Sequence, residues 1–164
     1  MILVVDIDGT LADNSHREGF VQGSQKDWEA FYQPELVAWD KPIVEAQLGL
    51  PRLYTACTGL YIHTGRPERL RQVTENWLFK HFNMHFAMTS NLKYAHSTSP
   101  NYASLVMRDD RDHRPAVVYK EELHLYLKEW GRESRCIIDD DRRNEELYKK
   151  YGNFLKAPEI WRAL

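Results

Sequence analysis

The sequence predicts a doubly wound α/β fold with a mostly parallel sheet, and two observations favour this class. Short apolar runs rich in β-branched residues alternate along the chain with longer segments of helical periodicity. Polar or acidic residues directly follow several of these runs, as they do where parallel strands end at a ligand site. With 164 residues, the chain has the length of one domain. We therefore expect residues 1–164 to form a single domain with a small cap or insertion at about 13–40.

Four strands are expected from the apolar runs. The first is Ile2 to Val5, whose uniformly apolar character is typical of a strand buried on both faces. The second runs from Gly59 to His63. The third lies either in Phe86 to Met88 or in Leu105 to Met107, and the pattern does not rank these two. Cys136 to Ile138 is the last.

Helices are expected between these strands. One begins at Pro67, a residue that suits the first helical turn, and its apolar positions recur at helical spacing: Leu70, Val73, Trp77 and Leu78. A second runs from Pro115 to near Gly131, and a third from Asn144 to Tyr151.

Two segments do not follow the strand-helix rhythm. Residues 13–40 are expected to hold one short helix at most, capped near Ser24 and Asp27, with Trp28, Phe31 and Tyr32 on its apolar face. Residues 89–104 are expected to form a long loop. We interpret Trp28, Trp77 and Trp130 as core residues rather than base-stacking platforms, because they fall on expected apolar helix faces.

Composition and charge exclude several classes of protein. The formal net charge of −2 at pH 7 argues against a nucleic-acid binder that works by bulk electrostatics, so an anionic partner has to be captured locally. No apolar run is long enough to span a membrane. Cys57 and Cys136 form no paired motif, which argues against zinc and against a disulfide framework. We expect a soluble protein of the cytoplasm, and the sequence does not indicate its oligomeric state.

The strongest local signal is the run from Asp6 to Thr10, with the sequence Asp-Ile-Asp-Gly-Thr. Carboxylates two residues apart point to the same side of extended backbone, and Gly9 suits a tight turn. Apposed carboxylates are costly unless a cation or a shared proton offsets their repulsion. The run therefore indicates either a divalent metal site or an acidic loop of the kind that commonly follows a strand.

In this context the sequence resembles the haloacid dehalogenase superfamily. The family's four motifs occur in order, as the Asp6–Thr10 run, an apolar strand that ends in Thr64, Lys120, and an apolar strand that ends in Asp139 and Asp140. The resemblance covers nearly the whole chain and implies a phosphatase with the doubly wound core of that family.

A narrower resemblance is to the phosphatase half of bacteriophage polynucleotide kinase-phosphatase, a family that removes 3′ phosphates from nucleic-acid ends. It is carried by the run from Thr64 to Glu68, by Arg108, Asp112, Arg114 and Lys120, and by the Asp-Asp-Asp-Arg run that begins at Asp139. Arg17 and Arg66 would correspond to the family's arginines after the first two motifs. Ala116 departs from the pattern, because the family carries an acidic residue four positions before the lysine. The Gly-x-x-x-x-Gly-Lys-Ser/Thr motif of a P-loop kinase half does not occur in this chain.

The resemblance implies a role for each motif. Asp6 would attack phosphorus to form an aspartyl phosphate, and Asp8 would act as general acid and then as general base. Mg²⁺ would be held by Asp6, the backbone carbonyl of Asp8, and Asp139 or Asp140. Thr64 and Lys120 would contact the phosphoryl group. The remaining substrate-binding candidates are Arg17, Gly65, Arg66 and Arg108, and the expected partner is a phosphorylated nucleic-acid end or a nucleotide.

Alternatives stay open at each motif. Thr64 would serve equally as a helix N-cap, Lys120 as a solvated helix residue, and the acids from Asp139 to Asp141 as a helix-start cluster. Aligning the acids on Asn144 selects Asp139 and Asp140 for the metal, whereas aligning on Arg142 selects Asp140 and Asp141. Two other functions also fit: a phosphatase of free nucleotides (a 5′(3′)-nucleotidase) or of another small phosphoester, and a non-catalytic module that binds phosphate or nucleic-acid ends.

Overall fold

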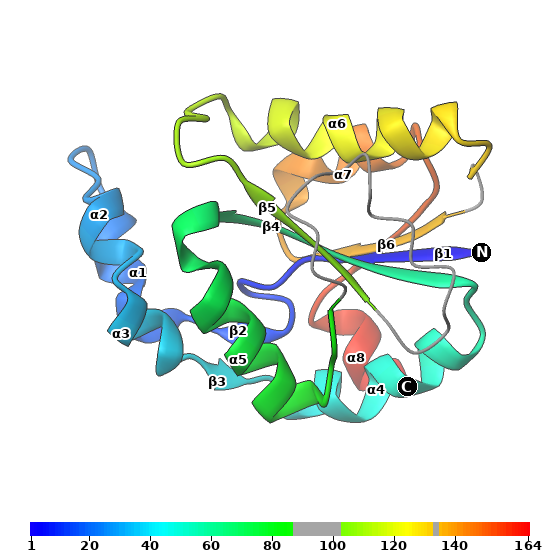
Figure 1. The fold of residues 1–164 in the computed structure, drawn as a ribbon, viewed down its shortest axis with the longest axis horizontal. Coiled ribbons are helices and arrows are strands. Elements are labelled where there is room, and N and C mark those ends of the chain that lie inside the picture. The colour runs from blue at the N-terminus through cyan, green and yellow to red at the C-terminus, as the bar shows by residue number, and fades with distance from the viewer. Residues whose placement is uncertain (87–102, 133–134) are drawn as a thin grey trace.

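In a computed structural model, which describes residues 1–86, 103–132 and 135–164, the chain is a three-layer α/β protein built on a five-stranded parallel sheet (Figure 1). The strand order is β5-β4-β1-β6-β7, so the first strand lies at the centre. The five strands are β1 Ile2–Val5, β4 Gly59–Pro67, β5 Ser104–Arg108, β6 Arg135–Asp139 and β7 Asn153–Lys156. Every neighbouring pair within this sheet is parallel. The predicted doubly wound class is confirmed.

Helices cover both faces of the sheet. On one face lie α4, α5 and α8, and on the other lie α6 and α7 (Figure 1). Their bounds are α4 Val44–Thr55, α5 Arg71–Phe82, α6 Ala116–Glu129, α7 Glu145–Tyr148 and α8 Glu159–Ala163, with 3₁₀ turns η2 Glu68–Leu70 and η4 Arg142–Asn144.

Two hydrophobic cores follow from the alternation of side chains along β1. Leu3 and Val5 face the core shared with α4, α5 and α8, whereas Ile2 and Val4 face the core under α6 and α7. Because β1 is buried on both faces, its sequence is uniformly apolar rather than alternating.

The segment between β1 and α4 lies beyond the sheet and is more helical than the sequence predicts. It contains β2 Ala12–Asp13, α1 Ser15–Glu18, η1 Gly19–Val21, α2 Trp28–Phe31, α3 Pro34–Ala38 and β3 Lys41–Pro42. The expectation of one short helix at most is therefore wrong. Asp27 does cap α2, since its side chain accepts a 2.9 Å hydrogen bond from Ala30 N, and Pro34 opens α3 at a position where its missing N–H costs nothing.

Several boundaries differ from the expected ones. The second strand extends to Pro67, because pairing with β5 resumes at Pro67 and Arg108 after an irregularity, so Pro67 ends a strand instead of opening a helix. Between the two candidates for the third strand, Leu105 to Met107 is correct. Phe86 makes only an isolated bridge to Ala103, while 87–88 and most of the expected 89–104 loop lie outside the described residues.

Elements near the end of the chain also differ. The expected helix from Asn144 to Tyr151 is confined to η4 and α7, whereas β7 and α8 are not predicted from the sequence pattern. In contrast, the helix from Pro115 and the strand at Cys136 to Ile138 are confirmed as α6 and β6.

The tryptophans divide between core and surface. Trp77 is buried, as predicted, but Trp28 is 50% exposed and Trp130 is 57% exposed, so their interpretation as core residues is wrong. In α2 the buried aromatic residue is Phe31, which takes the inward position of a helix only four residues long. No helix among the described residues meets the length and apolarity that a bilayer crossing requires.

Candidate functional site

The candidate site lies where β1, β4 and β6 end. Val5 is aligned with Ile62 on one side and with Ile138 on the other, so the residues that follow these strands meet at one edge of the sheet. The strand order reverses at β1, and ligands of doubly wound sheets bind outside the strand ends at such a switch point. Asp6 immediately follows β1, and Asp139 ends β6.

Gly9 shapes the turn after β1. Its φ of +74° lies in the left-handed region that favours glycine, and the backbone N–H groups of Thr10, Leu11 and Ala12 all donate to the carbonyl of Ile7. A Cβ at Gly9 would lie only 2.3 Å from Oδ2 of Asp140. The glycine therefore gives the turn its shape and leaves room for a neighbouring carboxylate.

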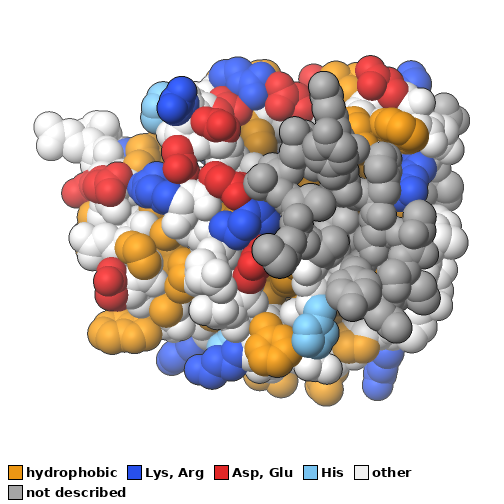
Figure 2. Space-filling view, viewed as in Figure 1, with side chains coloured by type: hydrophobic (Ala, Val, Ile, Leu, Met, Phe, Trp, Pro, Cys, Tyr) orange, Lys and Arg blue, Asp and Glu red, His pale blue; other side chains and the backbone are white. Residues whose placement is uncertain are grey.

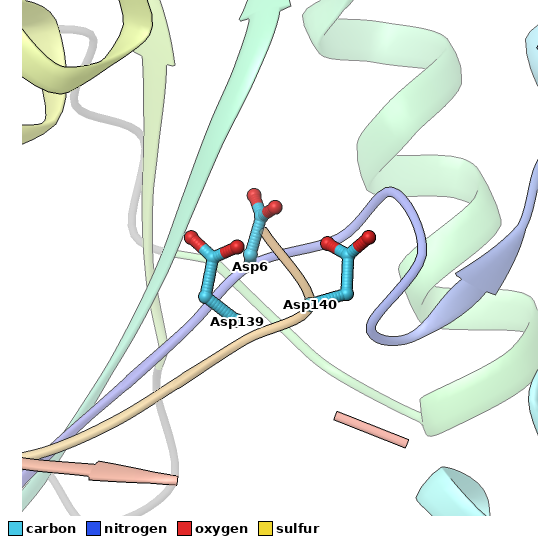
Figure 3. Close-up of side chains that lie close together, drawn as sticks. All are labelled: Asp6, Asp139 and Asp140. Carbon is cyan, nitrogen blue, oxygen red and sulfur yellow. The ribbon is translucent and has the colours of Figure 1, made fainter. Parts of the chain in front are cut away.

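Three carboxylates meet at this turn: those of Asp6, Asp139 and Asp140 (Figure 3). One oxygen of each lies within 4.8 Å of the others. Burial, together with the charges of Asp139 and Asp140, raises the pKa of Asp6 well above its usual value, against the opposing effect of Lys120. Burial and the charge of Asp139 likewise raise the pKa of Asp140 to about 6. The cluster thus holds more negative charge than its surroundings offset.

Lys120 is the ammonium of this cluster. It projects from the second turn of α6, and its Nζ lies 3.1 Å from Asp6 Oδ2 and 2.6 Å from Asp139 Oδ2. Burial alone would lower the pKa of Lys120, but Asp139 and Asp6 raise it well above the usual value, so the side chain is a cation. Since Lys120 is only 4% exposed, its interpretation as a solvated helix residue is wrong.

The register of the acidic triplet follows from the same geometry. The carboxylate of Asp141 turns away from the cluster, accepts a 2.9 Å hydrogen bond from Arg143 N, and pairs with the Arg143 guanidinium at 2.8 Å. It thereby caps η4. Asp139 and Asp140 join Asp6, whereas Asp141 caps η4.

Asp8 pairs with two arginines and does not join this cluster. Arg66 donates to both oxygens of Asp8 at 3.0 and 2.8 Å, and Arg17 also donates to Oδ1. Although burial alone would raise the pKa of Asp8, Arg66 and Arg17 lower it to about 2. Asp8 is therefore a carboxylate at neutral pH, and its side chain is not part of the three-carboxylate cluster.

A fourth residue, Asp40, completes this arrangement and is not predicted from the sequence. Its Oδ2 accepts hydrogen bonds from Arg17 at 2.7 Å and from Arg66 at 2.6 Å, and its side chain is fully buried. The backbone carbonyl of Asp40 accepts a 2.7 Å hydrogen bond from the indole of Trp77, which ties the segment between α3 and β3 to α5. A lone aspartate ahead of a Lys-Pro pair carries no motif, so only the fold reveals it. We call Asp8, Arg17, Asp40 and Arg66 the buried ion network.

The structure places Arg17 and Arg66, two of the expected substrate-binding residues, in the buried ion network. Both arginines are 0% exposed and neither lines the surface of the site, because their guanidinium groups pair with Asp8 and Asp40. Arg108, by contrast, does line the site, where its guanidinium lies 4.9 Å from the ring centroid of Tyr119 and donates to the carbonyl of Arg114.

Thr64 and Gly65 lie within β4, directly before Arg66 in the chain. Thr64 is fully buried, and its Oγ1 accepts a 3.2 Å hydrogen bond from Arg66 N. It therefore stabilises the irregular end of β4, and its interpretation as a helix N-cap is wrong. Gly65 lines the site and accepts a 3.3 Å hydrogen bond from the hydroxyl of Tyr32 through its carbonyl.

These groups open into one cleft with a volume of about 1210 Å³. Asp6, Asp8, Gly9, Lys120 and Asp140 line its floor, together with Gly65 and Arg108. Its remaining walls come from the helical segment after β1, the loop before α6 and the start of η4. The site is thus a hollow with a charged floor, large enough for more than a phosphate.

The donor set fits a hard divalent cation. Three carboxylates converge here, and their oxygens are hard ligands of the kind that such a cation prefers. Among the described residues, Oδ1 of Asp6 is buried without a hydrogen-bond partner. A buried, unpartnered carboxylate oxygen and two raised carboxyl pKa values are both relieved by a cation bound between the carboxylates. The cluster is therefore compatible with Mg²⁺.

Fold and site together define a doubly wound α/β protein with a carboxylate cluster and a buried lysine at the strand ends. No family model matches the chain, and no curated protein matches it. A solved structure of a Pnkp1/Rnl/Hen1 complex contains a chain with a similar fold, at a TM-score of 0.63 and 19% identity. The similarity covers 94% of this chain and 44% of that one, so this chain spans less than half the length of its neighbour. At this identity, the comparison shows a shared fold.

Proposed function

We propose that this protein is a Mg²⁺-dependent phosphohydrolase of the haloacid dehalogenase type that removes a phosphate from the 3′ end of a nucleic acid. The observation that carries the proposal is the position of Asp6. Its carboxylate follows the central strand, lies 3.1 Å from the Lys120 ammonium, and faces Asp139 and Asp140. A nucleophile (Asp6), a cation (Lys120) and a set of metal-binding carboxylates thus lie next to one another in the cleft.

The nucleic-acid part of the proposal is supported by the structural neighbour and by the cleft. The neighbour belongs to a complex whose name includes Pnkp1, which is consistent with a polynucleotide kinase-phosphatase, and it shares the fold over nearly the whole of this chain. The cleft volume of about 1210 Å³ accommodates a nucleotide as well as its phosphate.

In the first chemical step, a carboxylate oxygen of Asp6 forms a bond to phosphorus, and the bond between phosphorus and the ester oxygen breaks. Asp8 delivers a proton to the leaving alkoxide. In the second step, water attacks phosphorus, the bond between phosphorus and Asp6 breaks, and Asp8 takes the proton of the water. Inorganic phosphate leaves, and Asp6 and Asp8 return to their starting forms.

Each supporting residue stabilises charge along this path. Lys120 places a fixed positive charge beside the attacking carboxylate and the phosphoryl oxygens. Asp6, Asp139, Asp140 and the backbone carbonyl of Asp8 would hold Mg²⁺, which offsets the repulsion between carboxylate and phosphate and polarises the transferring group. Thr64 has its hydroxyl proton available for a phosphoryl oxygen, because its Oγ1 acts as an acceptor toward Arg66 N.

The buried ion network sets the protonation of Asp8. With a pKa of about 2, Asp8 is ready to accept a proton from water but holds none to give to the leaving group. A phosphate dianion brought into the cleft adds negative charge near Asp8 and raises its pKa. Asp8 therefore takes up a proton from solvent as the substrate binds and returns a proton to solvent when phosphate leaves, and Arg17 and Arg66 act through Asp8 as positioning residues.

The test is a substrate panel: release of phosphate from a 3′-phosphorylated oligonucleotide, from nucleoside 3′- and 5′-monophosphates and from a small phosphoester, with Mg²⁺ and with chelator. We expect release from the oligonucleotide with Mg²⁺, none with chelator, and none from Asp6→Asn. Asp141→Asn makes the same chemical change outside the cluster and should retain activity. Faster release from the mononucleotides would favour a nucleotidase, and unchanged activity in Asp6→Asn would exclude the covalent mechanism.

A further inference from the structure

The cleft contains an exposed aromatic platform that the proposed chemistry does not use. Trp28, at the start of α2, lines the cleft and is 50% exposed. Trp39 and Trp130 are also exposed, at 72% and 57%, but neither lines the cleft. Single exposed aromatic residues are ordinary on protein surfaces, so the position of Trp28 in the cleft is the feature that calls for an explanation.

The indole of Trp28 is supported from behind by two further rings. It stacks on Tyr32 with ring centroids 6.0 Å apart and planes 21° apart, and it meets Phe31 edge-on at 5.6 Å. Phe31 is buried, and the hydroxyl of Tyr32 is tied to the carbonyl of Gly65 at 3.3 Å. The platform is therefore braced against β4, the strand that also contributes Thr64 and Arg66 to the site.

Positive charge lies beside this platform. Nζ of Lys26 is 5.7 Å from the centroid of the Trp28 ring, and among the described residues no carboxylate pairs with it. Most other cations of the cleft wall are neutralised, as Arg69 is by Glu29 and Arg114 by Asp112. Charged side chains of both signs are accordingly interleaved on the left half of the face seen in Figure 2. A half-exposed indole with an unpaired ammonium near its ring is the combination that single-stranded nucleic-acid sites use, with a base on the ring and a phosphodiester at the cation.

We propose that the exposed face of Trp28 stacks on the base of the nucleotide whose phosphate lies at Asp6, with Lys26 facing the adjoining phosphodiester. This proposal rests on the proposed function and adds to it a substrate class: unpaired ends, with little preference for base identity. Stacking requires a base whose face is free, and every base offers such a face. A terminal base pair inside a duplex does not present one.

Two oligonucleotides test the platform, both with a 3′ phosphate, one ending in a normal nucleotide and one in an abasic nucleotide. The wild-type protein should favour the end with a base by about 5- to 150-fold in kcat/KM, the range that one base–aromatic stack supplies. Trp28→Ala should bring that ratio close to one, and Trp28→Phe should retain part of it. Trp39→Ala removes an exposed tryptophan outside the cleft and should keep the wild-type ratio.

A ratio that survives in Trp28→Ala, or a variant that loses activity equally on both substrates, would overturn the platform while leaving the phosphatase proposal intact. If the wild-type protein releases no phosphate from any substrate, the phosphohydrolase proposal fails instead. The platform is then tested by a binding measurement, in which the same two oligonucleotides carry a fluorescent label and are titrated with wild-type and Trp28→Ala protein. The platform is supported if the wild-type protein binds the oligonucleotide that ends in a normal nucleotide more tightly than the abasic one and Trp28→Ala loses this preference. It is overturned if the wild-type protein binds both oligonucleotides equally.

Discussion

The hydroxyl of Tyr148 donates a 2.6 Å hydrogen bond to Oδ2 of Asp139, at the centre of the carboxylate cluster. The same oxygen accepts from Lys120 Nζ at 2.6 Å, and the other oxygen, Oδ1, accepts from Asp141 N at 2.8 Å. Asp139 is thus oriented by α6, by α7 and by its own loop. Loss of a group that orients a metal-binding carboxylate in this way typically lowers metal affinity by about 10- to 100-fold.

Tyr148→Phe should therefore weaken Mg²⁺ binding while leaving the fold intact, because only the hydroxyl is removed from a buried ring. We expect the dissociation constant to rise by about 10-fold, measured by calorimetric titration of the protein with Mg²⁺. Tyr151→Phe is the matched control, since its hydroxyl donates to Glu121, which is not part of the carboxylate cluster. Equal Mg²⁺ affinities in the two variants would show that the hydroxyl does not orient Asp139.

Gly9→Ala should disrupt the metal site by pushing Asp140 away from Asp6. The new Cβ would lie 2.3 Å from a carboxylate oxygen of Asp140, closer than any unstrained contact. Gly23→Ala is a sharp control, because Gly23 has a similar φ of +83° but nothing within 4 Å of the added Cβ. Both variants should lose about 1 kcal/mol of stability from backbone strain in chemical denaturation. Only Gly9→Ala should lose Mg²⁺ binding as well, and similar binding in both would contradict the steric explanation.

The central sheet could be predicted because its strands are buried on both faces, which leaves uniform apolar runs such as Ile2 to Val5. Helix α4 could not. It contains Gly49 and Pro51, two residues that weigh against a helix interior, and tertiary packing overrides them. A Cβ at Gly49 would lie 3.1 Å from the Trp161 ring, so the glycine is present for close packing against α8. That requirement arises from a residue more than a hundred positions away.

The carboxylate cluster could also be predicted from the sequence, because strand ends place Asp6, Asp139 and Asp140 at one edge of a parallel sheet. Asp40 and Tyr148 were not, since neither follows a strand nor belongs to a motif. Their roles come from side chains that meet across the fold: Asp40 with two arginines, and Tyr148 with Asp139. The spacing of residues along the chain does not indicate such contacts.

The buried ion network predicts that Arg66→Ala destabilises the fold, whereas motif spacing predicts that it weakens only substrate use. If Arg66 contacted only substrate, Arg66→Ala would leave the fold unchanged. In the structure, Arg66→Ala would leave Asp8 and Asp40 with only Arg17 as a partner. The side chains of both arginines and of Asp40 are fully buried there. We expect a loss of about 3–5 kcal/mol in the free energy of unfolding, measured with urea.

Arg69→Ala is the control for that loss, because Arg69 pairs with Glu29 at the surface, where such pairs contribute at most about 1 kcal/mol. Asp40→Ala should be as damaging as Arg66→Ala, since it leaves two buried guanidinium groups with one carboxylate. Unfolding midpoints that match those of Arg69→Ala in both variants would show that the network does not stabilise the fold.

His124 on α6 links stability to pH. It is fully buried, and among the described residues neither ring nitrogen has a hydrogen-bond partner. Burial, Arg135 and Lys120 lower its pKa to about 3, against the opposing charge of Asp139. The neighbouring rings are those of His63, Tyr148 and Tyr151, and burial also lowers the pKa of His63 well below its usual value.

The folded protein therefore keeps His124 neutral from pH 6.5 down to about 3, while the unfolded chain takes up a proton over that range. Because the unfolded state binds more protons, stability falls as the pH falls below 6.5, by up to about 1.4 kcal/mol per pH unit for this residue. His124→Phe removes the titrating group and keeps a ring in the aromatic cluster. Its free energy of unfolding should fall less than that of the wild type between pH 6.5 and 5, by about 2 kcal/mol. His113→Phe, in the exposed loop before α6, should keep the wild-type slope, and a wild-type slope in His124→Phe would show that His124 does not titrate on unfolding.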